Sequence, residues 1–200
     1  MLTPQFVPVN GADAIALKDL TPVGDDVDTD GGITIQTLSS GGRTVDMYQW
    51  IDWGDPKGWC DGDYAIVDGV TFPAGQGLWV TGTSDGAAIQ SAGKVGTADA
   101  VVQLRSGATA TGNPFPITID LQDIVPEGED IDTDGGITIQ TLSSGGRTVD
   151  MYQWIDWGDP KGWCDGDYTL VEGVTFPAGQ GLWVTGTKDT EYLRFPAPEL

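Results

Sequence analysis

Apolar and polar residues alternate along much of this chain, and turns rich in glycine, proline and aspartate interrupt the alternation. In residues 33–38 (ITIQTL), isoleucines alternate with polar residues until a Ser-Ser-Gly-Gly run ends the pattern. Residues 43–53 alternate again, with Val45, Met47 and Ile51 on one side of the segment. Period-two alternation that is bounded by turn residues predicts β-strands.

Other short segments share this pattern, and no run of ten or more residues carries a helical period with capping residues. The additional predicted strands are residues 13–20, 69–72, 78–83, 98–105 and 191–195. Residues 54–58 (GDPKG) and 61–63 (DGD) are predicted loops. Short strands between frequent turns predict an all-β fold of antiparallel β-sandwich units, of the jelly-roll or immunoglobulin-like type.

The chain contains one long segment twice. Residues 28–83 recur at 132–187 with three substitutions in 56 positions, and the alignment continues ungapped from 1–96 onto 105–200. The substitutions are Ala65/Thr169, Ile66/Leu170 and Asp68/Glu172. The sequence therefore predicts two tandem sandwich units, unit 1 (residues 1–96) and unit 2 (residues 105–200). About 100 residues are enough for each unit to have its own hydrophobic core.

The connecting residues 97–104 are either a plain linker or a shared strand. The alternation in residues 98–105 (ADAVVQLR) favours a strand, and its counterpart in unit 1 would precede residue 1. If the segment completes unit 2, unit 1 is one strand short. Its open sheet edge then invites strand addition by a neighbour. The sequence leaves both interpretations open.

Charge narrows the range of partners. The chain has 30 acidic and 9 basic residues, no histidine and a formal net charge of −21. Nucleic acids and anionic membranes are disfavoured, because binding to them depends on Lys and Arg. No run of 18 apolar residues occurs, and the first residues lack the basic and apolar regions of a signal peptide. We expect protein partners, with a glycan as an alternative, on a virion surface or outside a cell.

An aspartate-rich turn in each unit has the spacing of a calcium loop. Asp at positions 1, 3 and 5, Gly at 6 and Ile at 8 match the first part of an EF-hand loop, where carboxylates converge on one cation. The predicted ligands are Asp26, Asp28, Asp30, Asp130, Asp132 and Asp134, with further oxygens from Asp52, Asp55, Asp61 or Asp63. Position 12, however, is Thr37 or Thr141 in place of glutamate. Ca²⁺ is therefore the one candidate cofactor, and an acidic turn without metal is the alternative.

Eight tryptophans lie within the repeated segment, four in each unit. Three of each four fall in the sequence WIDWGDPKGW, beside aspartates. The candidates for contact with a protein or a glycan are Trp50, Trp53, Trp59, Trp154, Trp157 and Trp163. Core packing is the alternative for some of them, because each ring buries a large apolar area.

Residues for catalysis are scarce, and we expect no enzymatic activity. Without histidine, the chain has no Ser-His or Cys-His pair and no histidine-ligated zinc site. Unit 1 has no glutamate, so an acid pair there would consist of aspartates, which turns favour for their own reasons. Cys60 and Cys164 are equivalent positions that can form a disulfide only near the axis relating the units. Two reduced thiols are the expectation.

Two motifs resemble repeats of bacterial proteins. GNPFP occurs at residues 112–116, and PAGQGLWV occurs at 73–80 and 177–184. Their order resembles β-sandwich repeats of surface and secreted proteins, notably in the Bacteroidetes. The duplicated acidic layout also resembles proteins of gut Verrucomicrobia-type bacteria and their phages. The resemblance implies external display and carries no catalytic residues, and unit 1 lacks GNPFP.

These features predict a non-enzymatic structural or interaction protein with two copies of one contact surface. The first hypothesis is a virion component, such as a capsid-decoration or head-fibre protein, or else a surface filament subunit. The alternative is a calcium-assisted carbohydrate-binding or adhesion module. Two identical faces on a short connector raise the effective concentration of the second contact, if the geometry lets both engage.

Overall fold

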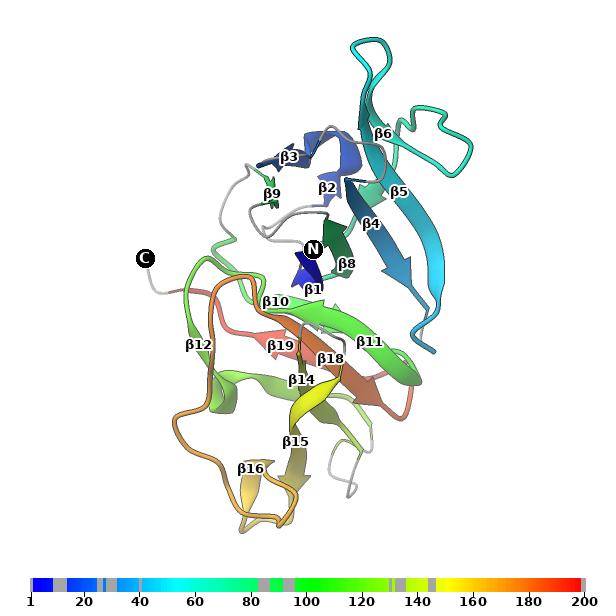
Figure 1. Cartoon of the computed structure of the whole chain (residues 1–200). Coiled ribbons are helices and arrows are strands. Elements are labelled where there is room, and N and C mark those ends of the chain that lie inside the picture. Colours follow the sequence, from blue (N-terminus) through cyan, green and yellow to red (C-terminus); the bar gives the residue numbers. More distant parts are fainter. Residues whose placement is uncertain are drawn as a thin grey trace.

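Each unit is built around a five-stranded antiparallel sheet with the same strand order (Figure 1). The computed structural model describes residues 2–8 (backbone only), 14–24, 27, 32–39, 41–82, 87–91, 96–129, 131, 136–143 and 147–198. In unit 1 the order is β1-β8-β4-β5-β6, and in unit 2 it is β11-β18-β14-β15-β16. The predicted all-β, sandwich-type fold is confirmed.

The strands of the two large sheets correspond pairwise between the units. In unit 1 they are β1 (Leu2–Pro8), β4 (Ile33–Leu38), β5 (Thr44–Asp52), β6 (Lys57–Cys60) and β8 (Gly77–Gly82). In unit 2 they are β11 (Gly107–Gly112), β14 (Thr138–Leu142), β15 (Thr148–Asp156), β16 (Lys161–Cys164) and β18 (Gly181–Gly186).

The smaller sheets differ between the units. In unit 2, β10 (Ala100–Gln103), β19 (Tyr192–Phe195) and β13 (Val125–Glu127) form a three-stranded sheet in the order β10-β19-β13. In unit 1 the corresponding sheet has only two strands in the described residues, β3 (Thr21–Val23) and β9 (Ala88–Gln90). Both units also have a short pair, β2 (Ile15–Ala16) with β7 (Thr71–Phe72), and β12 (Ile119–Asp120) with β17 (Thr175–Phe176).

The connecting segment is therefore a strand of unit 2. Val102 lies opposite Leu193 in the ladder between β10 and β19, and its side chain is buried in the core of unit 2. The alternation in residues 98–105 thus corresponds to strand β10, Ala100–Gln103, which pairs as part of a sheet.

Two local predictions from the sequence are wrong. The segment 13–20 leaves the strand after β2 and forms a 3-10 turn at Leu17–Asp19, because Leu17 turns into the core and its N–H donates to the carbonyl of Val70. The end of the predicted loop 54–58 begins strand β6 instead. Trp59 anchors β6, because its ring is buried and its Nε1 donates to the carbonyl of Leu20 over 2.8 Å.

The alternation on β5 places one face inward and the other outward. Tyr48 and Trp50 pack against the core of unit 1, while Val45 and Met47 are exposed. Ile51 is fully buried on the outward side, opposite Gly58 on β6.

Each unit has its own cluster of buried apolar residues, and the cluster of unit 2 is larger. Val102, Leu104 and Phe115 are buried in unit 2 and come from segments that differ from unit 1 or have no counterpart in it. Burial of identical residues also differs between the units: Val184 is 0 % exposed, whereas Val80 is only partly buried. The same 56-residue segment thus lies in two different surroundings.

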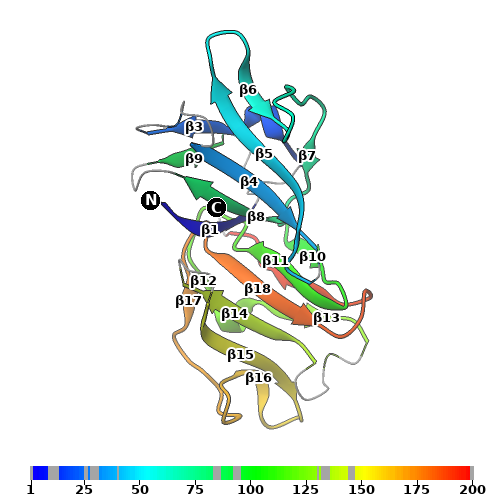
Figure 2. The same cartoon turned by 45° about the vertical axis from the view of Figure 1, so that its right-hand side comes forward.

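The two units meet through equivalent strands. β1 and β8 lie against β11 and β18, as Figure 2 shows. At Gly77 the backbones are so close that an added Cβ would lie 2.5 Å from the carbonyl carbon of Ala110 and 2.7 Å from the nitrogen of Thr111. The Thr111 hydroxyl donates to the carbonyl oxygen of Gly75. Close packing and a buried hydrogen bond therefore hold the units together.

Within the described residues, the only helical segments are two three-residue turns, and neither can cross a membrane.

Asp99 fixes the beginning of β10. Its carboxylate accepts hydrogen bonds from the N–H of Ala197 (2.8 Å) and from Nη1 of Arg194 (3.1 Å). Nε of Arg194 donates to Glu127 over 2.6 Å, so one guanidinium links both neighbours of β19. The backbone N–H and the guanidinium lower the pKa of the Asp99 carboxyl.

We predict that Asp99→Asn lowers the melting temperature of unit 2 at pH 7. A carboxyl with a lowered pKa stabilises the fold above the pKa of an unfolded Asp, about 3.9, and the stabilisation is lost as pH falls through the folded-state pKa. Thermal unfolding between pH 7 and pH 2 should show that the variant melts at a lower temperature than the unmodified protein at pH 7, and that this difference disappears below about pH 4. Asp123→Asn, at an exposed position without a described hydrogen bond, is the control. A deficit that does not change with pH would contradict this role.

We predict that Gly77→Ala lowers the free energy of unfolding by about 1–3 kcal/mol, because β8 and β11 must separate to admit the methyl group. Urea unfolding measures the change. Gly62→Ala is the matched control, since a Cβ at Gly62 has no atom within 4 Å. Equal stability of the two variants would show that the approach of the units is not tight in solution.

Candidate contact surfaces

The hairpin between β5 and β6 projects from unit 1 and ends in a short turn (Figure 1). Asp52 and Lys57, which lie on either side of this turn at the end of β5 and the start of β6, form an ion pair. The N–H of Gly54 also donates to Asp52 (3.3 Å). The bond from Lys57 and, after it, the N–H of Gly54 lower the pKa of the Asp52 carboxyl. In unit 2 the equivalent pair, Asp156 with Lys161, has a separation of 2.6 Å. The turn is thus held in the same way in both units.

An exposed, stacked aromatic pair stands beside this turn. Trp53 and Tyr64 have ring centroids 5.5 Å apart at an interplanar angle of 29°, and their side chains are 54 % and 43 % exposed. Ile66, at the end of the same loop, is also exposed. We call Trp53, Tyr64 and Ile66 the tip patch of unit 1.

Hydrogen bonds in the loop hold Tyr64 in position. Asp61 accepts from the N–H groups of Asp63 and Ala65, each over 3.0 Å, and the N–H of Tyr64 donates to the carbonyl of Asp61. Tyr64 has a φ of 61°, in the left-handed region that side chains other than Gly rarely occupy. Such strain persists where surrounding contacts fix the backbone, and it gathers at functional positions.

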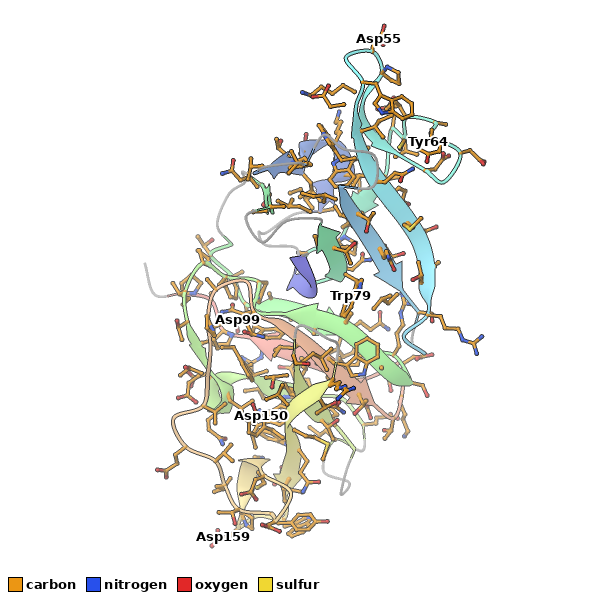
Figure 3. All side chains as sticks on the ribbon, viewed as in Figure 1. Asp55, Tyr64, Trp79, Asp99, Asp150 and Asp159 are labelled. Atoms are coloured by element: carbon orange, nitrogen blue, oxygen red, sulfur yellow. The ribbon has the colours of Figure 1, made fainter. Side chains whose placement is uncertain are left out.

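Unit 2 repeats this arrangement at the opposite end of the molecule. Trp157 and Tyr168 stack with centroids 5.3 Å apart at 29°, and Tyr168 has a φ of 60°. Leu170 takes the place of Ile66 in the tip patch of unit 2. In Figure 3, Asp55 and Asp159, which mark the two turns, lie at opposite extremes of the molecule. The two tip patches therefore lie at opposite ends of the molecule.

The other predicted contact tryptophans belong to the cores. Trp59, Trp154 and Trp163 are buried, and Trp50 is partly buried against the core of unit 1. Trp50 and Trp59 meet edge to face with centroids 5.5 Å apart, as do Trp154 and Trp163. Burial removes the rings of Trp59, Trp154 and Trp163 from direct contact with a partner, whereas Trp50 keeps part of its surface exposed. Of the six candidates, Trp53 and Trp157 have exposed rings.

The structure does not test the predicted calcium loops. Asp26, Asp28, Asp30, Asp130, Asp132 and Asp134 lie outside the described residues. Among the residues that are described, no group of three or more Cys, Asp or Glu side chains is placed to hold a metal ion, and this includes the aspartates around the tip patches.

The two cysteines are buried thiols without a disulfide, as expected. Cys60 and Cys164 occupy equivalent places in separate units. Sγ of Cys60 donates to the carbonyl of Gln49 over 3.3 Å. Burial, and secondarily Asp165, raise the pKa of the Cys164 thiol. Neither thiol is suited to act as a nucleophile.

A groove of about 410 Å³ lies between the units and is lined by equivalent residues from both. Its lining is Trp79, Gln36, Leu38, Thr44 and Gly42 from unit 1, and Trp183, Gln140, Leu142 and Thr148 from unit 2. The pairwise lining indicates that an approximate two-fold axis passes through the groove. None of these side chains is charged, although the chain as a whole is strongly acidic. The groove thus offers uncharged polar groups beside two indole rings.

Sequence reasoning missed two features of these surfaces. Tyr64 and Tyr168 were not singled out, although a tyrosine within an Asp-Gly-Asp-Tyr turn was the available signal. Trp79 and Trp183 lie on strands β8 and β18, so their meeting at the groove depends on how the units pack.

Comparison of the chain with protein-family models, with curated proteins and with solved structures gives no match. The fold and the surfaces above are therefore the basis for a functional proposal.

Proposed function

We propose that this protein is a non-enzymatic structural protein that bridges two copies of a protein partner, one at each tip patch. The observation that carries the proposal is the duplication of an exposed, stacked Trp–Tyr pair in the same geometry at both ends of the molecule. Exposed aromatic rings on a rigid loop are typical anchors of protein interfaces, since they bury much area at little entropic cost.

The placement of the tips favours bridging over attachment to one flat surface. Two sites at opposite ends of the molecule are poorly placed to bind adjacent positions on one plane, so simultaneous binding to a single surface is disfavoured. They can instead connect two subunits on either side of the protein. Such a role suits a component of an ordered lattice, either a capsid-decoration or head-fibre protein of a virion or a subunit of a surface filament.

The net charge of −21 also bears on the partner. Like charges repel at an interface, and complementary charge speeds association. The partner surface is therefore neutral or basic around an apolar pocket that accepts the Trp–Tyr pair.

We predict that Trp53→Ala or Trp157→Ala abolishes bridging but leaves binding at the intact tip, while the double variant loses both. Truncation of a central aromatic anchor weakens a contact by about 2 kcal/mol or more, roughly 30-fold. The measurement is rebinding of purified protein to particles or filaments stripped of it, followed by electron microscopy and sedimentation. Ile117→Ala, at an exposed position away from both tips, is the control. Undiminished rebinding of the double variant would refute the role of the tips.

A carbohydrate-binding module is the second candidate, and the uncharged groove favours it. Thr44 donates to the side-chain oxygen of Gln36 (2.7 Å), and Thr148 does so to Gln140 (2.8 Å), so both carboxamides are held in fixed orientations beside Trp79 and Trp183. Indole faces and fixed amides suit a neutral sugar, which offers C–H faces and hydroxyl groups.

We predict for this candidate that a glycan array shows binding that Trp183→Ala removes, since that ring lines the groove. Binding that EDTA also abolishes would support the calcium-assisted form. A glycan array that shows no binding under conditions that detect millimolar affinities would exclude this candidate. The bridging proposal would be unaffected.

A further inference from the structure

In unit 2, β10 completes the smaller sheet and part of the core. It pairs antiparallel with β19, with Val102 opposite Leu193, and the N–H of Leu104 donates to the carbonyl of Glu191 over 2.8 Å. Leu104 is fully buried and Val102 nearly so. A single extended segment therefore supplies both ladder hydrogen bonds and apolar side chains.

In unit 1 the corresponding strand β9 is paired on one side only. β9 pairs with β3, with Ile89 opposite Pro22, and no described strand lies along its other edge. The edge that β10 covers on β19 is thus open on β9 within the described residues.

Equivalent side chains show the effect of this difference. Val184 and Leu193 are completely buried in unit 2, while their counterparts Val80 and Ile89 are only partly buried. The structure thus leaves apolar surface uncovered in unit 1 at the place where Val102 and Leu104 lie in unit 2.

A turn of unit 2 gives a second, independent indication that this surface of unit 1 is uncovered. A Cβ on Gly75 would lie 2.5 Å from the side chain of Val102, because the 73–77 turn of unit 1 packs on β10. A Cβ on the equivalent Gly179 would meet no atom within 4 Å. Ala178 is accordingly exposed, whereas its counterpart Ala74 is partly buried. Under the approximate two-fold relation, the space beside Gly179 is where a partner of β9 would lie.

We propose that the open edge of β9 binds an extended segment of a separate protein chain, in the way that β19 binds β10. The segment runs antiparallel to β9, places one apolar side chain opposite Ile89, and places a second one two residues later over Val80. Strand addition of this kind takes affinity from backbone hydrogen bonds and specificity from alternate side chains. Since the chain is strongly acidic, a segment with basic flanking residues is favoured, and the template itself ends in Arg105. The proposal uses a different surface from the tip patches.

The decisive experiment completes the edge within the full chain. Residues 97–104 are copied ahead of residue 1, which restores in unit 1 the order that unit 2 has. We expect the extension to raise the melting temperature of unit 1 by about 5 °C or more, and to slow amide exchange in β9. The matched control carries Val102→Asp and Leu104→Asp in the copied segment only. Equal behaviour of the extended protein and its control would overturn the proposal.

A binding measurement tests the same edge in trans. A labelled peptide of residues 97–105 should bind the unmodified protein, and the extended protein should lose this binding because its edge is already occupied. The Trp53→Ala/Trp157→Ala variant should bind the peptide normally, which separates this result from the role of the tips. Peptide binding that persists in the extended protein would place the peptide elsewhere and refute the proposal. Self-association of the unmodified chain that the extension abolishes would support it and identify the partner as a second copy.

Discussion

Pairing of backbone N–H and C=O groups along the strand edges is the constraint on which the rest of this structure depends. The large sheet of each unit is formed from the nearly identical segment together with one flanking strand, β1 or β11, and it is the same in both. The smaller sheet depends on what the flanks provide, and among the described strands only that of unit 2 has a third member, β10. A strand edge without a partner exposes a row of donors and acceptors. The repeated sequence thus accompanies a three-stranded smaller sheet in unit 2 and a two-stranded one in the described part of unit 1.

The same flanking segment also determines how the units pack. Val102 of β10 lies between the core of unit 2 and the 73–77 turn of unit 1, which approaches β11 closely enough to require glycine at position 77. Strand completion and contact between the units are therefore coupled through β10. The tip patches lie far from this contact and owe their rigidity to local hydrogen bonds around Asp61 and its copy Asp165. The two units therefore differ where they contact each other in the middle of the molecule and agree at its two ends.

Sequence alone predicted the regular parts of the fold well. Alternation identified β4, β5, β8, β10 and β19, because each has one face in a core and one face outside it. It failed at Lys57–Cys60, where a Gly-Pro-rich start hides a strand whose only strong signal is the buried Trp59. It also failed at residues 13–20, where local alternation was broken by the need of Leu17 to turn inward. Tertiary packing decided both cases.

The candidate surfaces were less predictable than the strands. Tryptophans were identified as contact residues by their number and neighbours, and four of the six proved to be core or partly buried rings. Exposure depends on which face of a strand turns inward and on whether a loop folds back, and neither is encoded locally. The stacking of Trp53 on Tyr64 joins residues from two loops, and the groove joins residues from two units. The spacing of residues along the chain does not predict such contacts.

The position of β10 ahead of unit 2 has a consequence for how such a gene evolves. Long identical stretches recombine readily, and each crossover between them would add a whole 104-residue period, connecting strand included. Every added unit would arrive with its own copy of β10. Growth by duplication would therefore lengthen the array without adding an open strand edge.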